Sequence, residues 1–144
     1  SVTPPKVSPA ARTPGPQLGA DGQDPRAGEF VQEVELRRSA AGCQPLRDNE
    51  VLRDAAKSQA LELWSRQGAA AHVDHKGATA QDRVTKLGYH GHVIEVVASG
   101  TKRVDQVVGA FDWVMTDSDL LDCTYKSSGA AVVDGFWVLV LGSV

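Results

Sequence analysis

The chain has 144 residues, 42% of them hydrophobic, and a formal net charge of -3 at neutral pH. That length suits one domain with one apolar core. The acidic balance gives no broad basic field to attract nucleic acid or acidic membrane, and no apolar run approaches the roughly 20 residues of a membrane-spanning helix.

Residues 1–28 differ in composition from the rest of the chain. They hold six of the seven prolines and few large apolar side chains. Such a segment buries too little surface to offset its ordering entropy, so we expect a disordered Pro-rich linker before a domain at 29–144. A polyproline II recognition strand is the alternative. The chain begins at Ser1 and its only methionine is Met115, so we expect a piece of a longer product, with room for an anchor or signal peptide ahead of it.

Two helices are expected first. Phe30, Val31, Val34 and the run 38–41 indicate a helix that ends at Gly42. In the second helix Asp48 and Asn49 are cap candidates and Glu50 is an acid in the first turn. Its apolar residues form one stripe that stops before Gly68, namely Leu52, Ala55, Ala56, Ala60, Leu63 and Trp64.

A short helix over 79–87, a strand and another helix follow. Thr79 and Asp82 have the spacing of a capping box, and Gly88 follows the helix end. The β-branched run 92–97 predicts a strand, and apolar residues from Val104 to Met115 recur at helical spacing.

The C-terminal part predicts a hairpin. Residues 130–133 and 136–141 are strand-like, and Asp134-Gly135 between them tolerates the positive φ of a type I′ turn. Helices followed by strands that return through a hairpin predict an α+β domain.

One ordered set of residues carries a family resemblance. It comprises Gly42-Cys43-Gln44-Pro45-Leu46, Ala55-Ala56, His72, Asp82-Arg83, Gly88-Tyr89, Glu95 and Cys123. The set resembles the CAP superfamily, the cysteine-rich secretory, antigen 5 and pathogenesis-related type-1 proteins, in a short bacterial form. The resemblance covers about residues 29–144 and implies an α-β-α sandwich around a small antiparallel sheet.

The chain also departs from the family pattern. The family's Gly-Glu-Asn-Ile-Ala segment corresponds to Ile94-Glu95-Val96-Val97-Ala98, so two of its three most diagnostic residues differ. The family's second histidine belongs between Trp113 and Cys123, where this chain has neither His nor Arg. Asp119 is the candidate for part of that space. The resemblance therefore implies a degenerate site, with His72, Glu95 and Asp119 as the residues of its cleft.

The resemblance also implies that Cys43 pairs with Cys123. A bond between them would close a loop of about 80 residues and stabilise the domain by around 4 kcal/mol. The alternative is two buried free thiols in a cytosolic protein. A disulfide and a Pro-rich spacer both suit an extracytoplasmic protein, secreted or held at a membrane anchor.

Metal binding is an open alternative. In the family the paired His and Glu can hold a divalent metal, and a zinc site needs three or four protein ligands. His72 and Glu95 supply two, and Asp119 and His75 are candidates for the others. A second set can be drawn from His72, Asp74, His75, His90 and His92, since His90 and His92 would face one way on a strand. Surface histidines without a metal are the alternative for each.

Two functional hypotheses remain. The first is a non-catalytic binding or interaction module for an apolar small molecule, an envelope component or a protein partner. The second is a metal-dependent hydrolase that uses a remodelled His72 and Glu95 cleft. No Ser or Cys has a context that marks it as a nucleophile. Asp82 and Arg83 are expected to cap a helix and bind a nearby carboxylate, and Trp64 and Trp113 to belong to the core.

Overall fold

The structure is a computed structural model that describes residues 26–68, 72–100, 103–114 and 120–144, with the side chains of 110–114 left aside. The candidate Asp119, the side chain of Trp113 and the expected linker up to residue 25 lie outside the described residues. The elements in chain order are α1 Ala27–Ala40, β1 Arg47–Asp48, α2 Glu50–Ser65, α3 Ala80–Lys86, β2 Val93–Ser99, α4 Val104–Val114, β3 Ser127–Val133 and β4 Phe136–Gly142.

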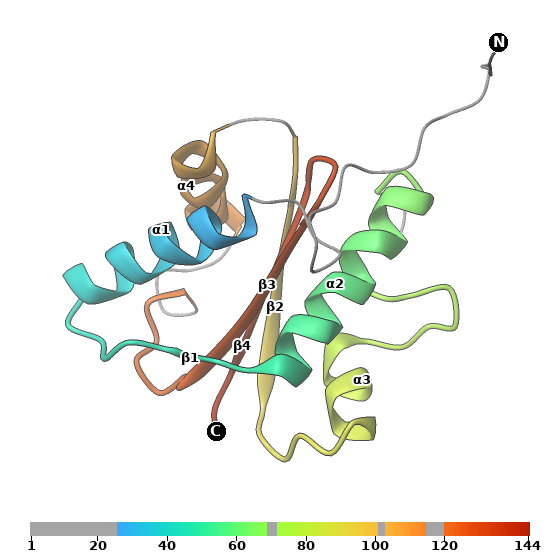
Figure 1. The fold of residues 1–144 in the computed structure, drawn as a ribbon, viewed down its shortest axis with the longest axis horizontal. Coiled ribbons are helices and arrows are strands. Elements are labelled where there is room, and N and C mark those ends of the chain that lie inside the picture. Colours follow the sequence, from blue (N-terminus) through green and yellow to red (C-terminus); the bar gives the residue numbers. More distant parts are fainter. Residues whose placement is uncertain (1–25, 69–71, 101–102, 115–119) are drawn as a thin grey trace, which may run out of the picture.

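The elements form three layers. Helices α1 and α4 lie on one side of the sheet, and α2 and α3 lie on the other (Figure 1). The sheet order is β1-β3-β4-β2, with β4 antiparallel to both of its neighbours. This arrangement confirms the predicted α+β sandwich. Within the described residues no helix is long and apolar enough to cross a membrane.

The predicted helix caps and hairpin turn are confirmed. The Asn49 side chain accepts a hydrogen bond from the amide of Leu52 at the start of α2. Thr79 and Asp82 form the predicted capping box of α3. Asp134 and Gly135 have φ values of 45° and 85°, as a type I′ hairpin turn requires.

Two differences from the sequence-based expectation concern boundaries and sheet type. Helix α1 begins at Ala27, so the last two residues assigned to the linker are helical. The sheet is mixed, because β1 pairs with β3 in parallel. This pairing is held by hydrogen bonds from Arg47 N to Lys126 O and from Asn49 N to Ser128 O, each 2.9 Å long.

Strand β4 lies at the centre of two apolar layers. Trp137, Leu139 and Leu141 face α1 and α4, whereas Val138 and Val140 face α2 and α3. Burial on both faces explains why this strand is apolar throughout. On the neighbouring strand, a Cβ at Gly129 would overlap main-chain atoms of Leu52 and Arg53, so the first turn of α2 lies directly against the sheet.

Candidate functional site

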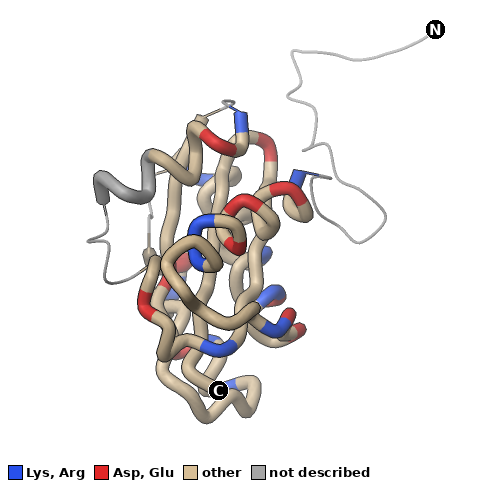
Figure 2. The backbone as a smooth tube through the Cα atoms, turned by 90° about the vertical axis from the view of Figure 1, so that its left-hand side faces the viewer, with Lys and Arg blue, Asp and Glu red and all other residues tan. Residues whose placement is uncertain are grey.

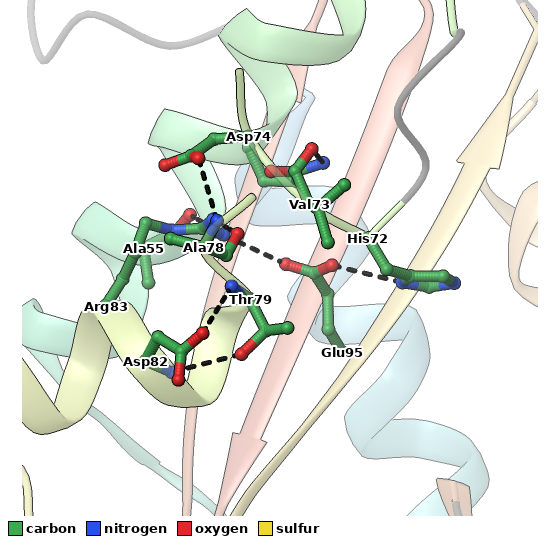
Figure 3. A network of polar contacts seen from close by, with 10 residues as sticks. Ala55, His72, Val73, Asp74, Ala78, Thr79, Asp82, Arg83 and Glu95 are labelled. Atoms are coloured by element: carbon green, nitrogen blue, oxygen red, sulfur yellow. Dashed lines mark hydrogen bonds and ion pairs between the residues drawn. The ribbon is translucent and has the colours of Figure 1, made fainter. Parts of the chain in front are cut away.

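Glu95 is the centre of the candidate site (Figure 3). It lies on β2 and its side chain is only 5% exposed. Its Oε1 lies 3.1 Å from Nδ1 of His72, and its Oε2 accepts a hydrogen bond of 3.3 Å from Nη2 of Arg83. The structure therefore brings together two of the three predicted cleft residues and adds the arginine that was expected to bind a carboxylate.

Arg83 connects the site to its surroundings. It comes from α3, directly after the capping residue Asp82, and its Nη1 donates to the carbonyl of Ala78 at 3.1 Å. Nη2 also donates to the carbonyl of Ala55 on α2 at 3.5 Å. Its Nε is buried and has no hydrogen-bond partner among the described residues. The guanidinium thus holds Glu95 and the end of the loop that carries His72 in one place.

The loop 72–78 is itself well fixed. One carboxylate oxygen of Asp74 accepts hydrogen bonds from the amides of Lys76 and Ala78, at 2.8 and 2.9 Å. Gln59, buried on α2, donates to the carbonyl of Val73 at 3.3 Å. These bonds anchor the loop on both sides of its turn, so His72 starts from a defined main-chain position.

The burial of Glu95 determines the electrostatics of the site. Burial raises the pKa of Glu95, while the hydrogen bond with His72 and the charge of Arg83 act in the opposite direction. The His72 side chain is 59% exposed. When Nδ1 carries the proton and donates a hydrogen bond to Glu95, Nε2 presents a lone pair to solvent. That arrangement suits a hydrogen-bond acceptor, a base or one ligand of a metal ion.

Among the described residues, His75 contacts a different carboxylate from the one that His72 contacts. Nδ1 of His75 lies 2.9 Å from Oε1 of Glu62 on α2, and this hydrogen bond lowers the pKa of Glu62. The expectation that His90 and His92 share a strand face is wrong, because β2 begins at Val93. Among the described residues no three His, Cys, Asp or Glu side chains are grouped to hold a metal ion. A zinc site stays a prediction.

Gln59 and Glu62 were missed by sequence reasoning. Gln59 is fully buried within the stripe of α2, and a polar residue in an apolar stripe was the available indication. Glu62 gives no comparable indication, because an acid on a helix surface is usually solvated. Trp64 is half-buried, and its Nε1 donates to the Asp134 carboxylate at 3.2 Å, so it belongs to the framework of the hairpin.

The disulfide between Cys43 and Cys123 is present, as the resemblance implied. It joins the segment after α1 to the segment before β3. A hollow of about 460 Å³ beside it is lined by apolar groups of α1 and the following segment, including Val31, Leu36 and Pro45. This hollow lies at α1, whereas the His72 and Glu95 site lies on the α2 and α3 side of the sheet.

The layer order and the sheet define a CAP-like fold. No protein-family model and no curated protein matches the sequence. An outer surface protein of Borrelia burgdorferi has a TM-score of 0.68 at 20% identity, over 81% of this chain and 90% of its own. A cysteine-rich secretory protein from Staphylococcus aureus has a TM-score of 0.67 at 15% identity, over 88% of this chain and 41% of its own.

An extracellular protein containing an SCP domain, from Bacillus anthracis, has a TM-score of 0.71 at 16% identity, over 89% of this chain and 45% of its own. The chain therefore spans less than half the length of the Staphylococcus and Bacillus proteins. At these identities the likeness concerns the fold.

The substitution Glu95→Gln should change how stability depends on pH. Burial raises the pKa of Glu95 in the folded protein above its ordinary value of 4.5. The contribution of Glu95 to the free energy of unfolding is therefore fully present below the unfolded pKa and is lost as pH rises through the folded pKa. We expect the free energy of unfolding of the wild type to fall relative to that of Glu95→Gln as pH rises from about 4.5, and then to level off.

Urea unfolding of both proteins from about pH 3 to about pH 8 measures this difference. Asp54→Asn, on the exposed side of α2, is the matched control for loss of a carboxylate. A wild type that gains stability relative to Glu95→Gln as pH rises would show that His72 and Arg83 outweigh the burial of the carboxylate.

Proposed function

We propose that this chain is a non-catalytic, extracytoplasmic binding or interaction module of a bacterial exported or membrane-anchored protein. The observation that carries the proposal is the asymmetry of the site. In one half, His72 and Arg83 each contact the carboxylate of Glu95. The family's other half requires a later histidine, and this sequence has none after His92.

The disulfide supports the extracytoplasmic part of the proposal, because such bonds persist in oxidising compartments. The surface charges agree with a partner other than nucleic acid. Along the backbone drawn in Figure 2, the positions of Lys and Arg are interspersed with those of Asp and Glu and do not gather in one region. An envelope component or another protein therefore suits the module better than a polyanion.

The chemistry of His72 supports recognition over turnover. Its exposed imidazole is oriented by a buried carboxylate, which makes it a fixed hydrogen-bonding group. A hydrolase would in addition need a nucleophile, or a metal held by three or more ligands that activates a water molecule. His72 and Glu95 supply two such ligands, so the alternative, a metal-dependent hydrolase, needs a further ligand such as Asp119 or His75.

A zinc titration of the oxidised protein tests the proposal, read by imidazole and amide NMR shifts and by a screen for peptide and ester hydrolysis. We expect weak, scattered shifts and no turnover. His72→Ala and Glu95→Gln should leave zinc affinity unchanged, as should the control His90→Ala, which removes an exposed imidazole outside the site. Stoichiometric binding that both site substitutions abolish, with hydrolysis that His72→Ala stops, would establish the hydrolase instead.

A further inference from the structure

Strand β2 is the end strand of the sheet, and hydrogen bonding beyond its ends shows which of its residues face outward. The amide of Ser143 donates to the carbonyl of His92, and the amide of Gly100 donates to the carbonyl of Gly135. These bonds continue the antiparallel register of β2 with β4. Since bonded pairs alternate along an antiparallel ladder, 94, 96 and 98 bond β4, whereas 93, 95, 97 and 99 direct their N–H and C=O groups away from the sheet.

The first outward position is already covered. Gln81 of α3 accepts from the amide of Val93 at 2.9 Å and donates to the carbonyl of Gly91 at 3.1 Å. The side-chain amide of Gln81 therefore satisfies main-chain groups that a neighbouring strand would otherwise bind. No hydrogen bond among the described residues reaches the outward main-chain groups of Glu95, Val97 or Ser99.

In the part of the chain that the structure describes, this edge is unpaired, accessible and without the usual protection. Ser99 is exposed and Val97 is half-buried. Glu95 is half-buried as a residue while its side chain is only 5% exposed, so its exposure comes from the main chain. Exposed edges are normally blocked by proline, lysine or a bulge. Strand β2 has none of these, and its single charge points inward to Arg83.

We propose that the edge of β2 from Glu95 to Ser99 accepts an extended peptide segment of another protein as an added strand. This inference rests on the proposed function and names its class of partner. Main-chain hydrogen bonds would supply affinity, and alternate side chains would supply selectivity. One row of those side chains would lie on the face of Glu95, beside the exposed imidazole of His72, which would select a hydrogen-bonding residue there.

Two other occupants fit less well. The edge from Glu95 to Ser99 is about 17 Å long and about 5 Å wide, a strip of roughly 85 Å² against the roughly 800 Å² per partner that a stable dimer buries. A second copy would therefore need contacts that this strip does not supply, whereas a short peptide in a transient complex needs only the strip. The segment 1–25 of this chain holds six prolines, which lack the N–H that strand pairing needs.

Amide hydrogen exchange of the full chain, alone and with a pool of random heptapeptides, tests this inference. In the free protein we expect fast exchange for the amides of Glu95, Val97 and Ser99 and slow exchange for those of Val96 and Ala98. The pool should slow the first three at least tenfold and leave the other two unchanged. Slow exchange in the free protein would overturn the assignment. It would indicate a second copy if it depends on protein concentration, and the chain's own segment if it does not.

The substitution Val97→Pro removes one outward N–H without removing a bond to β4. It should reduce binding of a heptapeptide selected from the pool at least tenfold, while thermal unfolding shows that the fold is retained. The matched control Val97→Thr keeps the amide and should bind normally. Equal binding by both variants, or no protection with any peptide, would overturn the proposal. Protection that persists in His72→Ala would retain the edge and remove the role of His72.

Discussion

Removal of the disulfide between Cys43 and Cys123 should lower the free energy of unfolding by about 4 kcal/mol. The two cysteines are 80 residues apart in the chain, and the loop between them contains α2, α3, β2 and α4. A cross-link over so long a loop removes much of the conformational freedom of the unfolded chain. Urea unfolding of the oxidised wild type and of the double variant Cys43→Ala, Cys123→Ala measures the loss.

Reductant provides the control. Added thiol should destabilise the wild type by a similar amount and leave the double variant unchanged, which separates loss of the bond from any effect of the alanines. A loss below about 1 kcal/mol would mean that the reduced chain keeps residual structure that already limits its freedom. The expected loss is a large part of the stability of a domain of this size, so the chain should depend on an oxidising environment.

The fold could be predicted largely because its boundaries are encoded locally. Asn49 caps α2, Thr79 and Asp82 cap α3, and Asp134-Gly135 forms the hairpin turn, each through contacts within a few residues. Strand β1 could not be predicted in this way. It has two residues, and its pairing depends on main-chain groups of Lys126 and Ser128 that are almost 80 positions away.

The site was predictable only in part. His72 and Glu95 were found through the family resemblance, and the contact of Arg83 with a carboxylate followed from its place at a helix start. Gln59 and Glu62 became visible only when α2 and the loop 72–78 were placed together. Long-range contacts of this kind leave no periodic pattern in a single sequence. The proposed edge of β2 has the same origin, since sheet order decides which strand is last.

The site formed by His72, Glu95 and Arg83 and the edge of β2 from Glu95 to Ser99 fit one mode of recognition. Glu95 contributes its carboxylate to His72 and its main chain to the free edge. A ligand paired along β2 would thus meet the imidazole without any rearrangement of the loop 72–78, which its own turn and Arg83 already hold. Preorganisation of this kind lowers the entropic cost of binding. Binding in this way needs no second histidine at the site, and this sequence has no histidine after His92.

The second large effect is expected at Arg38, on the buried face of α1. Arg38→Met should lower the free energy of unfolding by about 3 kcal/mol, because hydrogen bonds to buried charged groups are strong. The side chain is 1% exposed. Its Nη1 donates to the carbonyls of Leu120 and Asp122, at 2.7 and 3.0 Å, and its Nη2 donates to that of Tyr125 at 3.2 Å.

The matched control is Arg37→Met, because Arg37 is half-buried and pairs with Glu33 one helical turn earlier. Such pairs contribute about 0.2–0.5 kcal/mol, and the other hydrogen bond of Arg37, to the carbonyl of Asp105 at 3.3 Å, is exposed to solvent. Urea unfolding should therefore show a much smaller loss. Arg38→Lys keeps the charge but cannot reach three carbonyls at once, and it should be nearly as harmful as Arg38→Met. An Arg38→Met protein as stable as the control would mean that the cost of burying the guanidinium, which lowers the pKa of Arg38, cancels its hydrogen bonds. In that case the disulfide and the main-chain hydrogen bonds of Lys126 would hold the segment that leads into β3.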